Sequence, residues 1–105
     1  MAYPIDNLPP VHPGEILADD LEALEMSARK FAEHIGKAPN AVTRIIKGEH
    51  SVSPEMAILL GRALGTSEQY WLNLQQNYDV KIARKAMAKR AAAIRPLVGA
   101  TRRAA

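Results

Sequence analysis

The stretch SARKFAEHIGKAPNAVTRIIKG, residues 27–48, decides the fold of this chain. It holds two short segments of helical periodicity, 28–35 and 39–47, and Gly36 between them suits a turn with positive φ. Ser27 is a favourable N-cap for the first segment, because its hydroxyl can accept a backbone N–H of the first turn. The stretch therefore predicts two short helices joined by a tight turn.

The second of these helices is predicted to have a weak start and a polar face. Pro39 suits its first turn, but Ala38 at the cap position offers no side-chain acceptor. Four polar side chains share one face through the spacing i, i+3, i+4, i+7, namely Asn40, Thr43, Arg44 and Lys47. In a DNA major groove Asn can pair with adenine and Arg with guanine, while Lys reaches guanine or phosphate. Sequence-specific DNA binding is therefore a hypothesis, although on these residues alone an exposed polar face without a function is the simpler explanation.

The two helices also meet the packing demands of a helix-turn-helix. The helix crossing needs a small residue, the turn needs a flexible residue, and the second helix needs an apolar residue that packs back. Counted from Ala28, these are Ala32 at position five, Gly36 at position nine and Val42 at position fifteen. This set favours a helix-turn-helix, with a plain helical hairpin as the alternative.

The rest of the chain predicts three further helices and no strand, so the expected fold class is all-α with five helices. The further helices are expected at 13–26, 54–64 and about 67–94. The predicted organisation is an extended N-terminal arm at 1–12, a helix-turn-helix domain at 13–80, and a basic C-terminal helix extension with a mobile tail at 81–105.

Composition excludes several classes of protein. A length of 105 residues suits one domain, and the absence of Cys excludes disulfides and thiolate zinc sites. No apolar run approaches the roughly 20 residues of a membrane span, and we see no secretory signal, so a cytoplasmic protein is expected. The three histidines have no ligand spacing and there is no glycine-rich phosphate loop, so we expect no metal, no cofactor and no enzyme.

Charge is distributed unevenly around a net value of +3. All 11 acidic residues lie within 1–79, whereas 81–105 contain basic residues and no acidic one. Such a basic end is a candidate second contact to nucleic acid, with an acidic protein partner, solubility or disorder as alternatives. If the last helix continues, one side of it carries Lys81, Arg84, Lys85 and Lys89.

Three segments of the chain match a known group of proteins. They are HPGEIL at 12–17, FAEHIGKAPNAVTRIIKGEHSVSPEMAILLGRALGTS at 31–67, and YWLNLQQNYD at 70–79. Together they resemble the HigA/VapI branch of the Cro/cI-type (XRE) helix-turn-helix proteins, which are antitoxins of HigBA-type toxin–antitoxin modules. The first segment and the WLNLQ part of the last mark this branch, whereas the central segment marks only the wider superfamily.

The resemblance implies that 39–47 is the recognition helix. The family's base-contacting positions correspond to Pro39, Asn40 and Arg44, with Thr43 beside them. Pro39 is a departure that offers no side-chain donor, so we expect direct base readout from Asn40 and Arg44.

Phosphate contacts are expected from basic side chains around that helix. Ala28 departs from the wider superfamily, which often has a phosphate-binding Gln there, so Arg29 or Lys30 is the candidate replacement. Lys37 in the turn and Lys47 at the helix end are the other candidates.

The resemblance also implies a homodimer on inverted repeats, with half-sites roughly 34 Å apart. We expect the dimer surface on the family's fifth helix, at Trp71, Leu74 and Tyr78. The alternative is that Trp71 belongs to the core beneath the first helix.

Three functions follow from these observations. The leading hypothesis is a DNA-binding antitoxin that represses its own operon and neutralises a HigB/RelE-like mRNA endonuclease toxin. The second is a free-standing transcriptional regulator of the same family without a toxin partner. The third is a helical adaptor that binds protein through the same fold, which predicts only weak, salt-dependent affinity for DNA.

Overall fold

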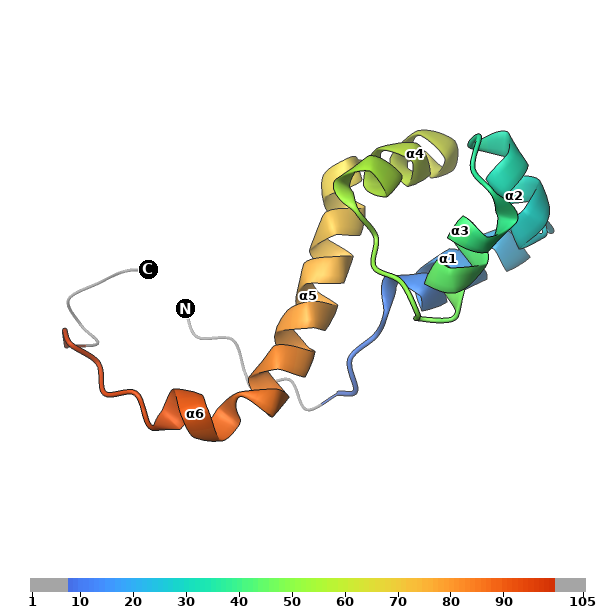
Figure 1. Cartoon of the computed structure of the whole chain (residues 1–105). Coiled ribbons are helices and arrows are strands. Elements are labelled where there is room, and N and C mark those ends of the chain that lie inside the picture. The colour runs from blue at the N-terminus through green and yellow to red at the C-terminus, as the bar shows by residue number, and fades with distance from the viewer. Residues whose placement is uncertain (1–7, 100–105) are drawn as a thin grey trace.

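The computed structural model describes residues 8–99, and this part of the chain contains helices and no strand. The helices are α1 (Pro13–Ala23), α2 (Ala28–His34), α3 (Pro39–Ile46), α4 (Pro54–Leu64), α5 (Glu68–Ala86) and α6 (Ala88–Ala92). The all-α prediction is thereby confirmed. Figure 1 shows α1 to α4 gathered at one end of α5, while the other end of α5 and α6 extend away from them. The molecule is accordingly elongated, measuring 52 × 24 × 22 Å.

The prediction for the fifth helix is wrong in one respect, because the helix breaks before its expected end near Ile94. Met87 departs from helical geometry, with φ −100° and ψ 3°, and separates α5 from α6. No described residue after Gln75 is buried, so no tertiary packing holds the helix straight at this point. The described chain therefore has six helices where the sequence predicted five.

Serine hydroxyls cap three of the helices. Ser27, Ser53 and Ser67 each accept the backbone N–H of the residue three positions later, at 3.0–3.1 Å. These bonds satisfy N–H groups that have no partner within their own helix. Ala38, by contrast, makes no side-chain cap for α3, as the sequence predicts.

The HPGEIL segment forms the start of α1, and its side chains have structural roles there. The Nδ1 atom of His12 accepts the N–H of Gly14 at 2.9 Å, and the Glu15 carboxylate accepts the N–H of His12 at 3.3 Å. Gly14 lies so close to α3 that a Cβ atom there would meet the Ile45 carbonyl oxygen at 1.8 Å. Only glycine fits this crossing, so the segment sets how α1 holds the end of α3.

One aliphatic core joins these helices around a single tryptophan. Its buried members come from α1 to α5 and from the loop before α4, and they are Leu17, Leu21, Phe31, Ala32, Val42, Ile45, Val52, Met56, Ala57, Leu60 and Trp71. Trp71 is 0% exposed, and its Nε1 atom donates to the Thr66 hydroxyl at 2.8 Å. Burial of these side chains supplies most of the driving force for folding.

Candidate nucleic-acid interface

The recognition-helix candidate α3 has one buried face and one exposed polar face. Val42 and Ile45 are almost fully buried in the core. On the other side Pro39, Asn40, Arg44 and Lys47 are exposed, and Thr43 is half-buried. The polar stripe predicted from the sequence therefore points away from the protein, where it can meet another molecule.

The exposed face of α3 is unoccupied by intramolecular interactions. Within residues 8–99, no side-chain hydrogen bond or ion pair engages Asn40, Arg44 or Lys47. Asn carries two donors and an acceptor, and Arg carries a planar set of donors. These groups are therefore available for the bidentate base contacts that the major groove offers.

Backbone geometry fixes α3 at both ends. At its start, the N–H of Lys37 donates to the carbonyl oxygen of Ala32 at 2.8 Å, which closes the turn at Gly36 (φ +73°). At its end, the N–H of Glu49 donates to the carbonyl oxygen of Arg44 at 2.9 Å, around Gly48 (φ +76°). Both turns use glycine in the left-handed region, where a side chain would be strained.

A buried glutamine secures the loop that follows α3. The Gln75 side chain on α5 accepts the N–H of Val52 at 2.8 Å and donates to Asp79 at 3.0 Å. It thus pairs a loop N–H for which residues 8–99 offer no other acceptor. Gln75 was not among the residues predicted from the sequence, although its place four residues after Trp71 puts it on the buried face of the helix.

The predicted phosphate contacts Arg29 and Lys37 lie in ion pairs within the chain. Arg29 Nε is 3.7 Å from Glu33 Oε2, and both side chains are mostly exposed. Lys37 Nζ is 2.7 Å from Glu55 Oε1, at the first turn of α4. The hydrogen bond from Lys37, and then its charge, lower the pKa of Glu55. Lys47 has no such partner within the described chain.

The predicted dimer residues lie mainly on the inner side of α5. Trp71 is core, as the alternative interpretation held, so its side chain cannot line a surface of the folded chain. Leu74 is half-buried against the core. The half-buried Tyr78 packs edge-on against the His12 ring, with centroids 4.9 Å apart. The structure thus favours the core interpretation for Trp71, in line with the large apolar area that an indole ring buries.

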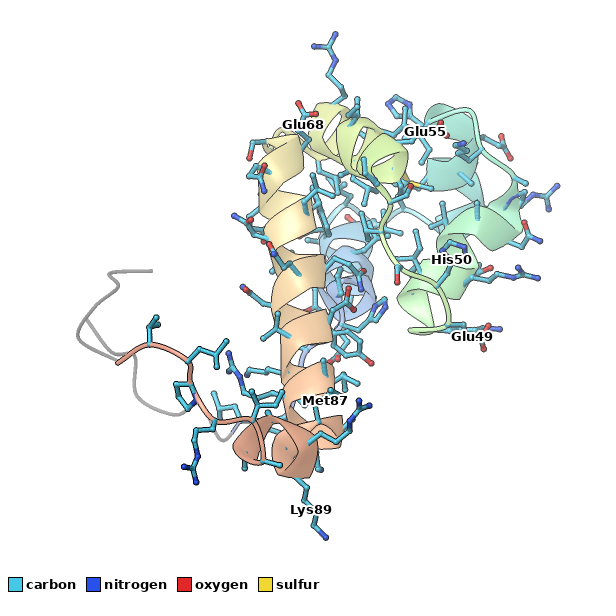
Figure 2. The ribbon with its side chains drawn as sticks, turned by 60° about the vertical axis from the view of Figure 1, so that its left-hand side comes forward. Glu49, His50, Glu55, Glu68, Met87 and Lys89 are labelled. Atoms are coloured by element: carbon cyan, nitrogen blue, oxygen red, sulfur yellow. The ribbon has the colours of Figure 1, made fainter. Side chains whose placement is uncertain are left out.

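The basic C-terminal part differs from its expected form. Arg84, Lys85 and Lys89 are exposed, whereas Lys81 is half-buried and its Nζ lies 3.4 Å from the carbonyl oxygen of Leu8. The break at Met87 means that Lys89 does not share one straight helix with the others. Figure 2 shows Lys89 pointing away from the rest of the molecule. The predicted mobile tail lies largely outside the described residues, as does most of the arm at 1–12.

Between Leu8 and Gly99, His, Asp and Glu side chains form no group of three that could hold a metal ion. No helix in this part is long and apolar enough to cross a membrane. The face of α3 is therefore the candidate site.

Comparisons with known proteins show the family to which the chain belongs. The model of the family described as "Helix-turn-helix" matches residues 17–71. A relative from Escherichia coli, the uncharacterized HTH-type transcriptional regulator YddM, is 40% identical over 70% of this chain and 78% of its own.

Two solved structures are similar over most of the chain. An addiction module antidote protein of the HigA family from Coxiella burnetii has a TM-score of 0.82 and 41% identity, covering 85% of this chain and 99% of its own. The Pseudomonas aeruginosa antitoxin HigA, solved with the higBA promoter, has a TM-score of 0.81 and 37% identity, with the same coverage.

Proposed function

The chain belongs to the helix-turn-helix family of Cro/cI type, in the branch that contains the HigA antitoxins, and on this premise we propose that it binds its own operator and neutralises a toxin. The observation that carries the DNA-binding part is the exposed, unpaired Asn40 and Arg44 on a helix whose other face is core. A solved relative, the Pseudomonas aeruginosa antitoxin HigA with the higBA promoter, supports DNA binding by a chain of this family. Action on an operator implies a cytoplasmic protein that works by binding and not by catalysis.

On DNA, α3 would lie in the major groove with Asn40 and Arg44 reading bases. Lys47 would contact phosphate, and Thr43 lies beside the base-reading pair. One such helix covers few base pairs, so we propose a homodimer on an inverted repeat with half-sites roughly 34 Å apart. Repression would follow from steric occlusion of the promoter.

The dimer surface is proposed on α5, at the parts of Leu74 and Tyr78 that the chain leaves accessible. Trp71 would act only indirectly, by holding α5 in place. Sedimentation equilibrium of Tyr78→Ala should show a weaker dimer than the wild type. An unchanged dimer would place the surface elsewhere.

Base readout is tested by replacing the exposed arginine. Arg44→Ala should lose roughly 1–3 kcal/mol of binding to the operator and relax its sequence preference. Lys47→Ala is the matched control, because a lost phosphate contact should weaken all duplexes about equally. Titration of both variants with operator and scrambled DNA checks this. If Arg44→Ala kept the full preference for operator, the assigned recognition face would be wrong.

The toxin partner is proposed to be a HigB/RelE-like mRNA endonuclease encoded beside this chain. Its support is the similarity to an antidote protein of the HigA family. Growth of cells that express the adjacent small open reading frame, with and without this protein, tests the proposal. Relief of growth arrest by this protein is the expected result. Toxicity that this protein does not change would contradict it.

The alternative function is a free-standing transcriptional regulator. Its support is that the E. coli relative YddM, which is 40% identical over 70% of this chain, is described as an HTH-type transcriptional regulator. Its DNA chemistry would be the same, so the operator titration does not separate the two. A harmless neighbouring gene together with intact operator binding would favour this alternative.

A further inference from the structure

Both ion pairs in the described part of the chain hold a cation that was predicted to contact phosphate. Arg29 pairs with Glu33, and Lys37 pairs with Glu55. The cations on the exposed face of α3, Arg44 and Lys47, have no such carboxylate between residues 8 and 99. Arg29 and Lys37 are therefore paired with carboxylates within the described chain, whereas Lys30, Arg44 and Lys47 are not.

The two pairs differ in strength. Arg29 and Glu33 lie on one helix, 3.7 Å apart, with side chains 80% and 62% exposed. Such a pair contributes little because water and salt screen it. Lys37 and Glu55 instead join the turn before α3 to the first turn of α4, at 2.7 Å, and the lysine side chain is only 33% exposed. This is a short, charge-assisted hydrogen bond between two elements whose backbones are already fixed.

Fixed backbones define where the Lys37 ammonium lies. Its own N–H closes the turn onto Ala32, and the Ser53 cap and Pro54 begin α4 one residue before Glu55. The Glu55 carboxylate thus takes one donor of the Lys37 ammonium and places a negative charge beside it. Burial of the lysine stem limits the other directions in which that ammonium can swing.

We propose that Glu55 withholds Lys37 from DNA phosphates and thereby limits the sequence-independent part of the affinity for DNA. The inference rests on the proposed DNA binding and deepens it. Phosphate contacts raise affinity for every duplex, whereas base contacts raise affinity for the operator alone. A carboxylate that occupies one phosphate-directed cation lowers non-specific binding and leaves the Asn40 and Arg44 readout intact. The affinity for every duplex is therefore lower, and less dependent on salt, than the same helix would give with Lys37 released.

The test is a double-mutant cycle on the full chain with a 20-base-pair duplex of random sequence, titrated at several KCl concentrations. The variants are Glu55→Gln, Lys37→Gln and the two together. Glu68→Gln is the matched control, because Glu68 is also an exposed first-turn carboxylate, on α5, and has no cation partner in the described chain. Figure 2 shows the two carboxylates at the starts of α4 and α5, with Glu55 on the side of α2. Circular dichroism melts verify that each variant is folded.

The expected result is specific to the pair. Glu55→Gln should bind the random duplex more tightly and steepen the dependence of log K on log salt by about 0.9, the value for one additional phosphate contact. Lys37→Gln alone should change the slope little, because Glu55 already holds that cation. In the Lys37→Gln background, Glu55→Gln should do no more than Glu68→Gln does. Operator affinity should rise by about the same factor as random-duplex affinity in Glu55→Gln, because a phosphate contact does not depend on base sequence.

Three results would overturn the proposal. An equal effect of Glu55→Gln with and without Lys37 would mean that the carboxylate merely repels DNA. A slope reduced by about 0.9 in Lys37→Gln alone would mean that Lys37 already contacts phosphate. If the wild type did not bind the random duplex at low salt, there would be no phosphate contact for which Glu55 could compete. The proposed function is tested separately, by the preference of the wild type for operator over random DNA. If that preference is absent but the Lys37–Glu55 coupling is measured, only the proposal of operator binding is contradicted.

Discussion

The packed end of the molecule and its C-terminal extension are both helical, but different forces hold them. Residues 12–75 contain every buried side chain of the described chain, and the extension from 76 to 99 contains none. At the packed end, helices of 7 to 11 residues persist because each buries a face in a shared core. In the extension, α6 has 5 residues and rests on local hydrogen bonds alone. The position of α3, and therefore of the candidate site, depends on tertiary packing, whereas the extension depends on local helix formation.

The largest effect is expected at the closest contact of the packed end. Gly14→Ala would place a Cβ atom 1.8 Å from the Ile45 carbonyl oxygen, so α1 and α3 would have to move apart. We expect a loss of about 3 kcal/mol of unfolding free energy, measured by urea denaturation. Gly99→Ala is the control, because nothing lies within 4 Å of its new methyl group. Equal stabilities would mean that α1 does not pack on α3 in this way.

The second largest effect is expected from the loss of a buried hydrogen bond. Gln75→Ala would leave the buried N–H of Val52 without its acceptor. The cost should be about 2 kcal/mol, since an unsatisfied buried group loses its full hydration. The neighbouring exposed Gln76→Ala should stay within about 0.5 kcal/mol of the wild type. A loss shared by both variants would indicate an effect on the helix itself, which urea denaturation of the pair would show.

The same substitution in each region tests the comparison directly. Ala32→Gly on α2 should cost about 1 kcal/mol or more of unfolding free energy, from helix propensity and lost packing at a fully buried site. Ala91→Gly on α6 should lower helical circular dichroism slightly and leave the main unfolding transition unchanged. A matching loss at position 91 would break the comparison, because it would show that the extension unfolds together with the core.

The smallest effect on stability is expected at a residue of the packed end whose backbone conformation is strained. Glu25 is exposed in the turn after α1 and has φ +52°, the left-handed region that favours glycine. Glu25→Gly should therefore raise the unfolding free energy by about 0.5 kcal/mol, the strain relieved less the added chain entropy. Glu22→Gly, inside α1, is the control and should destabilise. A thermal melt of the two variants separates these opposite signs.

Much of the fold could be predicted from local sequence signals. Ser27, Ser53 and the glycines at 36, 48 and 65 gave the helix limits at the packed end, because caps and left-handed turns depend on few neighbouring residues. The polar face of α3 followed from its spacing, since one side of a short helix must be buried. The break at Met87 could not be predicted, because nothing in the local sequence opposes a helix there and the missing factor is packing.

The candidate site divides in the same way. Sequence alone determined which residues could face DNA: Asn40, Thr43, Arg44 and Lys47 share a face whatever the rest of the chain does. Only the tertiary structure decided that Trp71 is core, that Gly14 sets the place of α3, and that Lys37 lies against Glu55. The physical reason is the distance along the chain over which each interaction acts. Helical periodicity acts over a few residues, whereas burial, close helix crossing and the Lys37–Glu55 ion pair join residues far apart in the chain, and only folding brings those together.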